Sequence, residues 1–205
     1  MRSLDRRIIG LALPALGSIA AEPLYNLADT AIVGHLGRQS LDSLAIAVSA
    51  LAIMAWVALF LTTATTSAVA RMAAASNRDG AGRAVGAAYL VAAGLGAVTA
   101  LLLAGAAPGL AWILGARGPV LAGAAGYLRA AAAGVPFLYL SYAGNGHLLG
   151  LADTRTPLRV ALSANAVNVA LEAGLVFGAH AGLAGSAWGT VAAQAFAAAW
   201  YALAS

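Results

Sequence analysis

The sequence has few charged residues, no cysteine and no lysine. Of its 205 residues only 9% are charged and 62% are hydrophobic, whereas an ordinary soluble domain carries about 25% charged residues. A chain so poor in charge cannot cover a water-facing surface, so we expect its surface to face the hydrocarbon of a lipid bilayer. The absence of cysteine excludes disulfides and thiolate metal sites.

The basic residues are all arginines, and they lie in short gaps between apolar runs. Proteins that bind nucleic acid gather their basic residues on one face, and no such gathering is visible here. The net charge of +4 is therefore interpreted as a membrane-topology signal, and no nucleic-acid partner is expected.

Long apolar runs recur along the whole chain and predict an all-α membrane protein. About 18 low-charge residues suffice to cross the hydrocarbon core as a helix, and in lipid every backbone polar group needs an internal partner, which helices provide. The segments of alternating polarity expected of a membrane barrel are absent from the sequence. Charged and turn residues divide the chain into six predicted spans: residues 8–35, 41–70, 84–107, 120–148, 158–178 and 183–203.

The distribution of arginine predicts the orientation of these spans. With the N-terminus in the cytoplasm, eight arginines fall on the cytoplasmic side and three on the other, which matches the positive-inside rule. The cytoplasmic set is Arg2, Arg6, Arg7, Arg71, Arg78, Arg83, Arg155 and Arg159, and the opposite set is Arg38, Arg117 and Arg129. We therefore expect a multi-pass protein of the inner (plasma) membrane with both termini in the cytoplasm.

Three acidic residues lie inside the predicted spans: Glu22 and Asp29 in the first and Glu172 in the fifth. A charge at the centre of the bilayer costs at least about 2.5–3.5 kcal/mol on insertion scales, so such a residue is a functional candidate. The acidic residues at span ends or in loops are interpreted as solvated charges: Asp5, Asp42, Asp79 and Asp153.

Depth in the bilayer predicts which candidates meet. Asp29 and Glu172 each lie six residues before the outer end of their span, which places both about 9 Å below that boundary at 1.5 Å per residue. Thr190 enters the sixth span from the same side and reaches nearly the same depth. Asn168 lies one turn below Glu172 on the same helix face. Four oxygen-bearing side chains on three helices are thus predicted to share one layer.

This layer suits a cation or a proton. Hard cations such as Na⁺ prefer carboxylate, amide and hydroxyl oxygens, and a buried carboxyl group can gain and lose a proton near neutral pH. The sequence leaves both coupling ions open and predicts no cofactor. The structural alternative is that these groups satisfy one another as polar contacts between helices.

Secondary candidates surround the layer. Glu22 lies two turns below Asp29, and Asn26 and Gln194 also carry side-chain oxygens within the first and sixth spans. Pro14 and Pro23 are candidate hinges because proline removes a helical hydrogen bond. No HExxH metal motif and no GxSxG nucleophile motif occur, so the chain is not expected to be an enzyme.

Several segments resemble one family of transporters. The first, Glu22 to Gly37, reads EPLYNLADTAIVGHLG and is similar to the first helix of MATE (multidrug and toxic compound extrusion) transporters of the DinF-type branch. The others resemble that family's fourth, fifth and sixth helices: GVPF at 134–137, DTRTPL at 153–158, NAVN at 165–168 and GLAGSA at 182–187.

The resemblance implies one six-helix lobe of a twelve-helix antiporter that exports organic cations, drugs or toxic compounds by alternating access, driven by H⁺ or Na⁺. It implies a cation site at Asp29, Asn168, Glu172 and Thr190, the layer predicted from depth. Two positions depart from the family pattern: the fifth-helix acid is usually aspartate rather than Glu172, and arginine commonly stands where this chain has Leu149.

The second lobe implied by the resemblance is absent from these 205 residues. We therefore expect a fragment or truncated product, rather than a half-transporter that dimerises. The expected partners are the missing C-terminal lobe, the lipid bilayer and a small organic substrate. Two alternatives stay open: a flippase for lipid-linked precursors, which would favour a larger and more cationic cavity, and a non-transporting structural membrane subunit.

Overall fold

The computed structural model describes the backbone of residues 2–205, and side chains from residue 12 onward except those of residues 14, 15, 18, 19, 21 and 22. The described chain is helical, with short connections. Its elements are α1 (Arg2–Gly34), α2 (Arg38–Ala74), α3 (Arg78–Ile113), α4 (Gly118–Ala132), α5 (Val135–Gly150), α6 (Arg155–Ala173), the π-helical turn η1 (Gly174–Gly178) and α7 (Gly182–Ala204).

Each of the six predicted spans falls on one helix or one pair of consecutive helical segments. By length and apolar composition, α2, α3 and the run of α6 with η1 are long enough to cross a membrane, and α4 with α5 forms a fourth candidate bent by 52°. This count covers the described residues. Membrane crossing by α1 and α7 stays a prediction.

Two predicted spans differ clearly from the helices. The third was predicted to end at residue 107, but α3 continues through Pro108 to Ile113. The helix ends where the Arg117 guanidinium donates hydrogen bonds to the carbonyls of Trp112 and Ala116, both at 2.7 Å. The span predicted at 120–148 is broken between α4 and α5, where Pro136 has no N–H to continue the helical ladder.

Close contacts between α2 and α5 show how the bundle is held together. Thr62 and Thr66 of α2 donate side-chain hydrogen bonds to the carbonyls of Tyr142 (2.8 Å) and Gly146 (3.0 Å) on α5. A Cβ added to Gly146 would lie 2.6 Å from the Thr62 carbonyl oxygen, so glycine is required for this approach. In lipid the hydrophobic effect does not drive helices together, and small residues with interhelical hydrogen bonds replace it.

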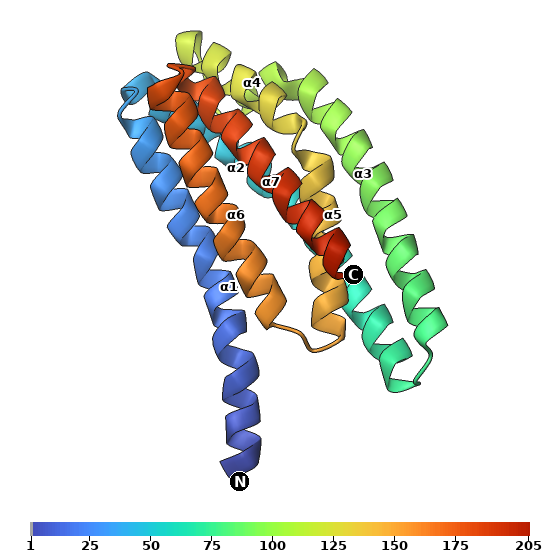
Figure 1. Cartoon of the computed structure of the whole chain (residues 1–205). Helices are drawn as coiled ribbons and strands as arrows, with labels where there is room; N and C mark the ends of the chain where they lie inside the picture. The colour runs from blue at the N-terminus through green and yellow to red at the C-terminus, as the bar shows by residue number, and fades with distance from the viewer. Residues whose placement is uncertain (1) are drawn as a thin grey trace.

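The helices form two groups with α7 between them (Figure 1). The long helix α1 runs beside α6, and α7 packs against α6 on one side and against α4 and α5 on the other. The connections at 35–37, 114–117 and 179–181 lie at one end of the bundle, and those at 75–77 and 151–154 lie at the other (Figure 1). The predicted layer of polar residues falls where α1, α6 and α7 converge near the first end.

Candidate functional site

Asp29 lies in the last two turns of α1 and is 3% exposed. Its carboxylate accepts a hydrogen bond of 2.8 Å from Ser186 Oγ near the start of α7, and Ser186 is fully buried. A carboxylate removed from water needs such donors. The bond therefore ties α1 to α7 and leaves Asp29 with further acceptor capacity.

Glu172 lies near the end of α6 and is fully buried. Its carboxyl group interacts electrostatically with Asp29 and Ser186, so the two acidic side chains face one another. Gly189 of α7 permits this burial, because a Cβ at that position would meet the backbone nitrogen of Glu172 at 3.1 Å. The π-turn η1 follows directly, and such turns are frequent at functional sites.

Thr190 is the centre of a second group of hydrogen bonds one turn further along α7. Its hydroxyl group lies 3.0 Å from the hydroxyl of Tyr25 on α1 and accepts a bond of 3.3 Å from the Asn168 amide on α6. The same hydroxyl is 3.2 Å from the Ser186 carbonyl oxygen. The two groups are thus adjacent and share helix α7.

Several buried acceptors of the site have no hydrogen-bond donor within the described part of the chain. Both carboxylate oxygens of Glu172 and the side-chain oxygen of Asn168 are buried without a hydrogen-bond donor among the described side chains. An unsatisfied buried acceptor costs about 1–3 kcal/mol. Three such acceptors beside the Asp29 carboxylate are the arrangement that a bound cation or an added proton would satisfy.

The structure brings together the four residues predicted from depth: Asp29, Asn168, Glu172 and Thr190. Sequence reasoning missed two tyrosines. Tyr25 lies one turn before Asp29 on the same face, so helical spacing could have found it. Tyr127 of α4 is 3% exposed, its hydroxyl interacts with Thr190 and Ser186, and it had no local signal because it comes from a distant helix.

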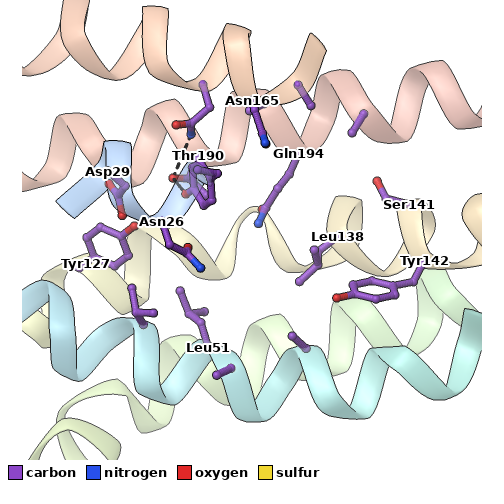
Figure 2. Close-up of a pocket in the computed structure, with 18 residues that line it drawn as sticks. Asn26, Asp29, Leu51, Tyr127, Leu138, Ser141, Tyr142, Asn165, Thr190 and Gln194 are labelled. Atoms are coloured by element: carbon purple, nitrogen blue, oxygen red, sulfur yellow. Dashed lines mark hydrogen bonds between the residues drawn. The ribbon is translucent and has the colours of Figure 1, made fainter. Parts of the chain in front are cut away.

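A cavity of about 340 Å³ opens beside these residues (Figure 2). Its wall combines small and apolar side chains with polar ones, and the lining residues include no arginine or lysine. The polar and aromatic lining residues are Tyr25, Asn26, Asp29, Tyr127, Ser141, Tyr142, Asn165, Asn168, Thr190 and Gln194. Its volume lies in the range of small-molecule sites. Asp29 and Tyr127 lie at one end of the labelled group, and Ser141 and Tyr142 lie at the other (Figure 2).

The secondary candidates fall in different places. Asn26 and Gln194 line the cavity, and a Cβ added at Gly134, at the break between α4 and α5, would collide with the Gln194 side-chain oxygen. Pro23 is exposed on α1. The side chains of Glu22 and Pro14 lie outside the described residues, and the hinge role of both prolines stays a prediction.

Comparison with known proteins now assigns the family. The profile of the MatE family matches residues 14–173. The chain belongs to the MatE family. It is 31% identical over 195 residues to "DNA damage-inducible protein F" of Escherichia coli, which confirms the predicted resemblance to the DinF-type MATE branch; the match covers 95% of this chain and 42% of that protein.

Two further comparisons place this chain within the MATE fold. It is 26% identical over 180 residues to "Probable multidrug resistance protein NorM" of Thermotoga maritima, covering 85% of this chain and 38% of the relative. It superimposes on a crystal structure of MATE in the bent conformation with a TM-score of 0.90 and 25% identity, over 97% of this chain and 44% of that one. The chain thus spans less than half the length of these MATE proteins and corresponds to one lobe.

Proposed function

We propose that this chain is one lobe of an ion-coupled membrane exporter of small organic, mostly cationic compounds, and that the complete transporter works by alternating access. The observation that carries the proposal is the buried, donor-poor layer of Asp29, Asn168 and Glu172 beside a cavity of small-molecule size. Names of relatives such as the NorM multidrug resistance protein support the substrate class.

The layer can couple the binding of the ion to the binding of the organic cation, because the negative charge of the Asp29–Glu172 pair attracts both. An empty pair formed by Asp29 and Glu172 carries negative charge, which attracts an organic cation into the cavity that Asp29 lines. A proton or Na⁺ on the pair lowers its negative charge and so weakens that attraction. By thermodynamic linkage, if the bound ion lowers the affinity for the organic molecule, the bound organic molecule lowers the affinity for the ion by the same factor. Antiport needs this reciprocal relation.

The layer contains groups suited to either coupling ion. A single proton on Glu172 would turn one unsatisfied acceptor into a donor and relieve the repulsion with Asp29. A Na⁺ ion would need several oxygens at fixed distances, which Asp29, Asn168, Glu172 and Thr190 together supply. The longer side chain of Glu172, compared with the family's usual aspartate, has one more torsion to order, and this favours the proton in our proposal.

The flippase alternative is less well supported by the cavity. A flippase for lipid-linked precursors would have to neutralise phosphate groups, for which arginine and lysine are the usual partners. No arginine or lysine lines the described cavity, whereas Asp29 does. The charge of the site thus favours cations over phosphorylated lipids.

The test is linkage measured on the purified chain. Binding of a fluorescent organic cation such as ethidium should weaken by about tenfold when the pH is lowered or Na⁺ is added. Asp29→Asn with Glu172→Gln should abolish that dependence, whereas Asp42→Asn, an exposed carboxylate on α2, should retain it. Dependence that survives in the double variant would refute this site as the coupling site.

Thr190 separates the two ions in the same assay. Under the proton proposal, Thr190→Val should retain the pH dependence because the hydroxyl is not an essential ligand. Binding that responds to Na⁺ rather than pH, and loses this response in Thr190→Val, would instead show that the four oxygens form a Na⁺ cage.

A further inference from the structure

Asp29 borders two cavities rather than one. Besides the main cavity, a crevice of about 230 Å³ lies between α1 and α2, and its lining includes Asn26, Asp29 and Thr30 of α1. From α2 it is lined by Leu41, Leu44, Ala45 and Val48. The proposed coupling carboxylate can therefore be approached from two directions.

The position of the crevice follows from helix periodicity. Asn26, Asp29 and Thr30 are spaced i, i+3 and i+4, so they share one face of α1. Leu41, Ala45 and Val48 share the facing side of α2, and the small side chain of Ala45 leaves space between the helices. Leu41 follows the start of α2 by three residues, so the crevice extends toward the connection at residues 35–37.

The main cavity continues along the same face of α2. Val48 lines both spaces, and the next residues on that face, Leu51, Ala52 and Ala55, line the main cavity alone. Crevice and cavity are thus consecutive along α2, and they meet at Asn26, Asp29 and Val48. An organic molecule bound against Leu51 and Ala52 would fill the cavity and leave the crevice, on the side of the connection 35–37, open.

We propose that the α1–α2 crevice is a separate passage for water and the coupling cation or proton, which keeps Asp29 accessible from the loop 35–37 end while an organic molecule occupies the main cavity. The proposal rests on the coupling role proposed for Asp29. It predicts that ion and organic substrate reach this carboxylate from different sides, so the ion can exchange without the substrate leaving first.

The crevice supplies the polar groups that such a passage needs at its inner end. Asn26 and Thr30 are exposed and Asp29 is buried, so the crevice leads from accessible amide and hydroxyl groups to the carboxylate. The Thr30 hydroxyl donates to the Asn26 carbonyl at 2.7 Å, which leaves its own oxygen free to accept from water. The α2 side of the crevice consists of leucine, alanine and valine side chains, which offer no polar group to an organic cation.

The chain offers a matched pair of positions for the test. Ala45 lines the crevice alone and Ala52 lines the main cavity alone, two turns apart on the same face of α2. Because the protein has no cysteine, Ala45→Cys and Ala52→Cys can each receive a bulky aromatic methanethiosulfonate after folding. A reductant removes the adduct again. The readout is the rate at which a small water-soluble carbodiimide modifies Asp29, followed by mass spectrometry of the purified chain.

With the adduct at position 52 alone, Asp29 should keep most of its modification rate, because the crevice remains open. With adducts at both positions the rate should fall by at least about tenfold, since both spaces that reach the carboxylate are then closed to reagent and water, and reductant should restore it. Loss of modification with the position 52 adduct alone would overturn the proposal, as would an unchanged rate with both adducts. The assay requires no organic ligand, so failure of ethidium binding would count against the proposed function and not against the passage.

Discussion

At the residue scale, the defining feature is the pairing of two buried carboxylates with too few donors. Ser186 supplies one hydrogen bond to Asp29, while the Glu172 oxygens receive none from the described side chains. Removing one partner from a buried ionic site is usually destabilising, but two like charges already oppose one another here. These unsatisfied acceptors are the basis on which we propose a cation or proton site here.

Asp153 shows the opposite behaviour of a carboxylate that has enough donors. It accepts hydrogen bonds from the backbone N–H groups of Arg155 (2.9 Å) and Thr156 (3.0 Å) and from the Thr156 hydroxyl (2.6 Å), and so caps the start of α6. Partial burial raises the pKa of Asp153, but these bonds, aided by the Arg159 guanidinium, outweigh it and hold the pKa below its usual value.

The lowered pKa of Asp153 predicts a pH effect on stability. Because the folded-state pKa lies below the unfolded one, the contribution is fully present above the unfolded value near 4 and is lost as pH falls through the folded value. Asp153→Ala should lower stability by about 1 kcal/mol at pH 7 and by less at acidic pH, measured by denaturation in detergent. Asp42→Ala is the control, since its surface pair with Arg38 is exposed; an equal loss at pH 3 and pH 7 would contradict the assignment.

At the scale of elements, glycine decides which helices touch. Gly146 and Gly150 of α5 lie against Thr62 and Val69 of α2, whereas an added Cβ at Gly94 of α3 would meet nothing within 4 Å. The sequence alone does not distinguish a glycine at a helix contact from one without a neighbouring helix. Their difference comes from the neighbouring helix, which the sequence does not place.

The α2–α5 contact predicts opposite effects for two identical changes. Gly146→Ala should destabilise the folded chain by about 1–3 kcal/mol, because the new methyl group collides with rigid backbone. Gly94→Ala should leave stability unchanged or raise it by up to about 1 kcal/mol through helix propensity. Thermal unfolding in detergent measures both. Equal effects of the two substitutions would show that α2 and α5 do not approach as described.

At the scale of the whole molecule, the ends of the bundle differ in charge. Arg71, Arg78 and Arg155 lie near the connections 75–77 and 151–154, while Arg38 lies near the connection 35–37 at the opposite end (Figure 1). The positive-inside rule then predicts that the end with the connections 75–77 and 151–154 faces the cytoplasm. That orientation is the basis for a labelling experiment.

Single cysteines report the orientation directly in this cysteine-free chain. Arg38→Cys should react with a membrane-impermeant maleimide added outside intact cells, whereas Ala75→Cys and Arg155→Cys should react only after the membrane is permeabilised. All three positions are exposed, so access to the reagent is limited by the membrane and not by burial. Outside labelling of Ala75→Cys together with protection of Arg38→Cys would reverse the orientation.

Much of the fold was predictable because lipid leaves so few options. A low-charge chain must turn its apolar residues outward and satisfy its backbone internally, so charges and turn residues suffice to place the helices. The layer of Asp29, Asn168, Glu172 and Thr190 was predictable for a related reason. The rise per residue converts sequence position into depth, and polar groups buried at the same depth need one another as partners.

What only the tertiary structure decided depends on lateral neighbours, which sequence position does not encode. The place of Tyr127 beside Asp29 follows from how distant helices pack. The same is true of the crevice beside Ala45, which is lined by residues of both α1 and α2. Along the bilayer normal, the helical rise of 1.5 Å per residue sets the depth of each side chain. In the plane of the membrane, positions are set by contacts between side chains of different helices, and these contacts exist only in the assembled bundle.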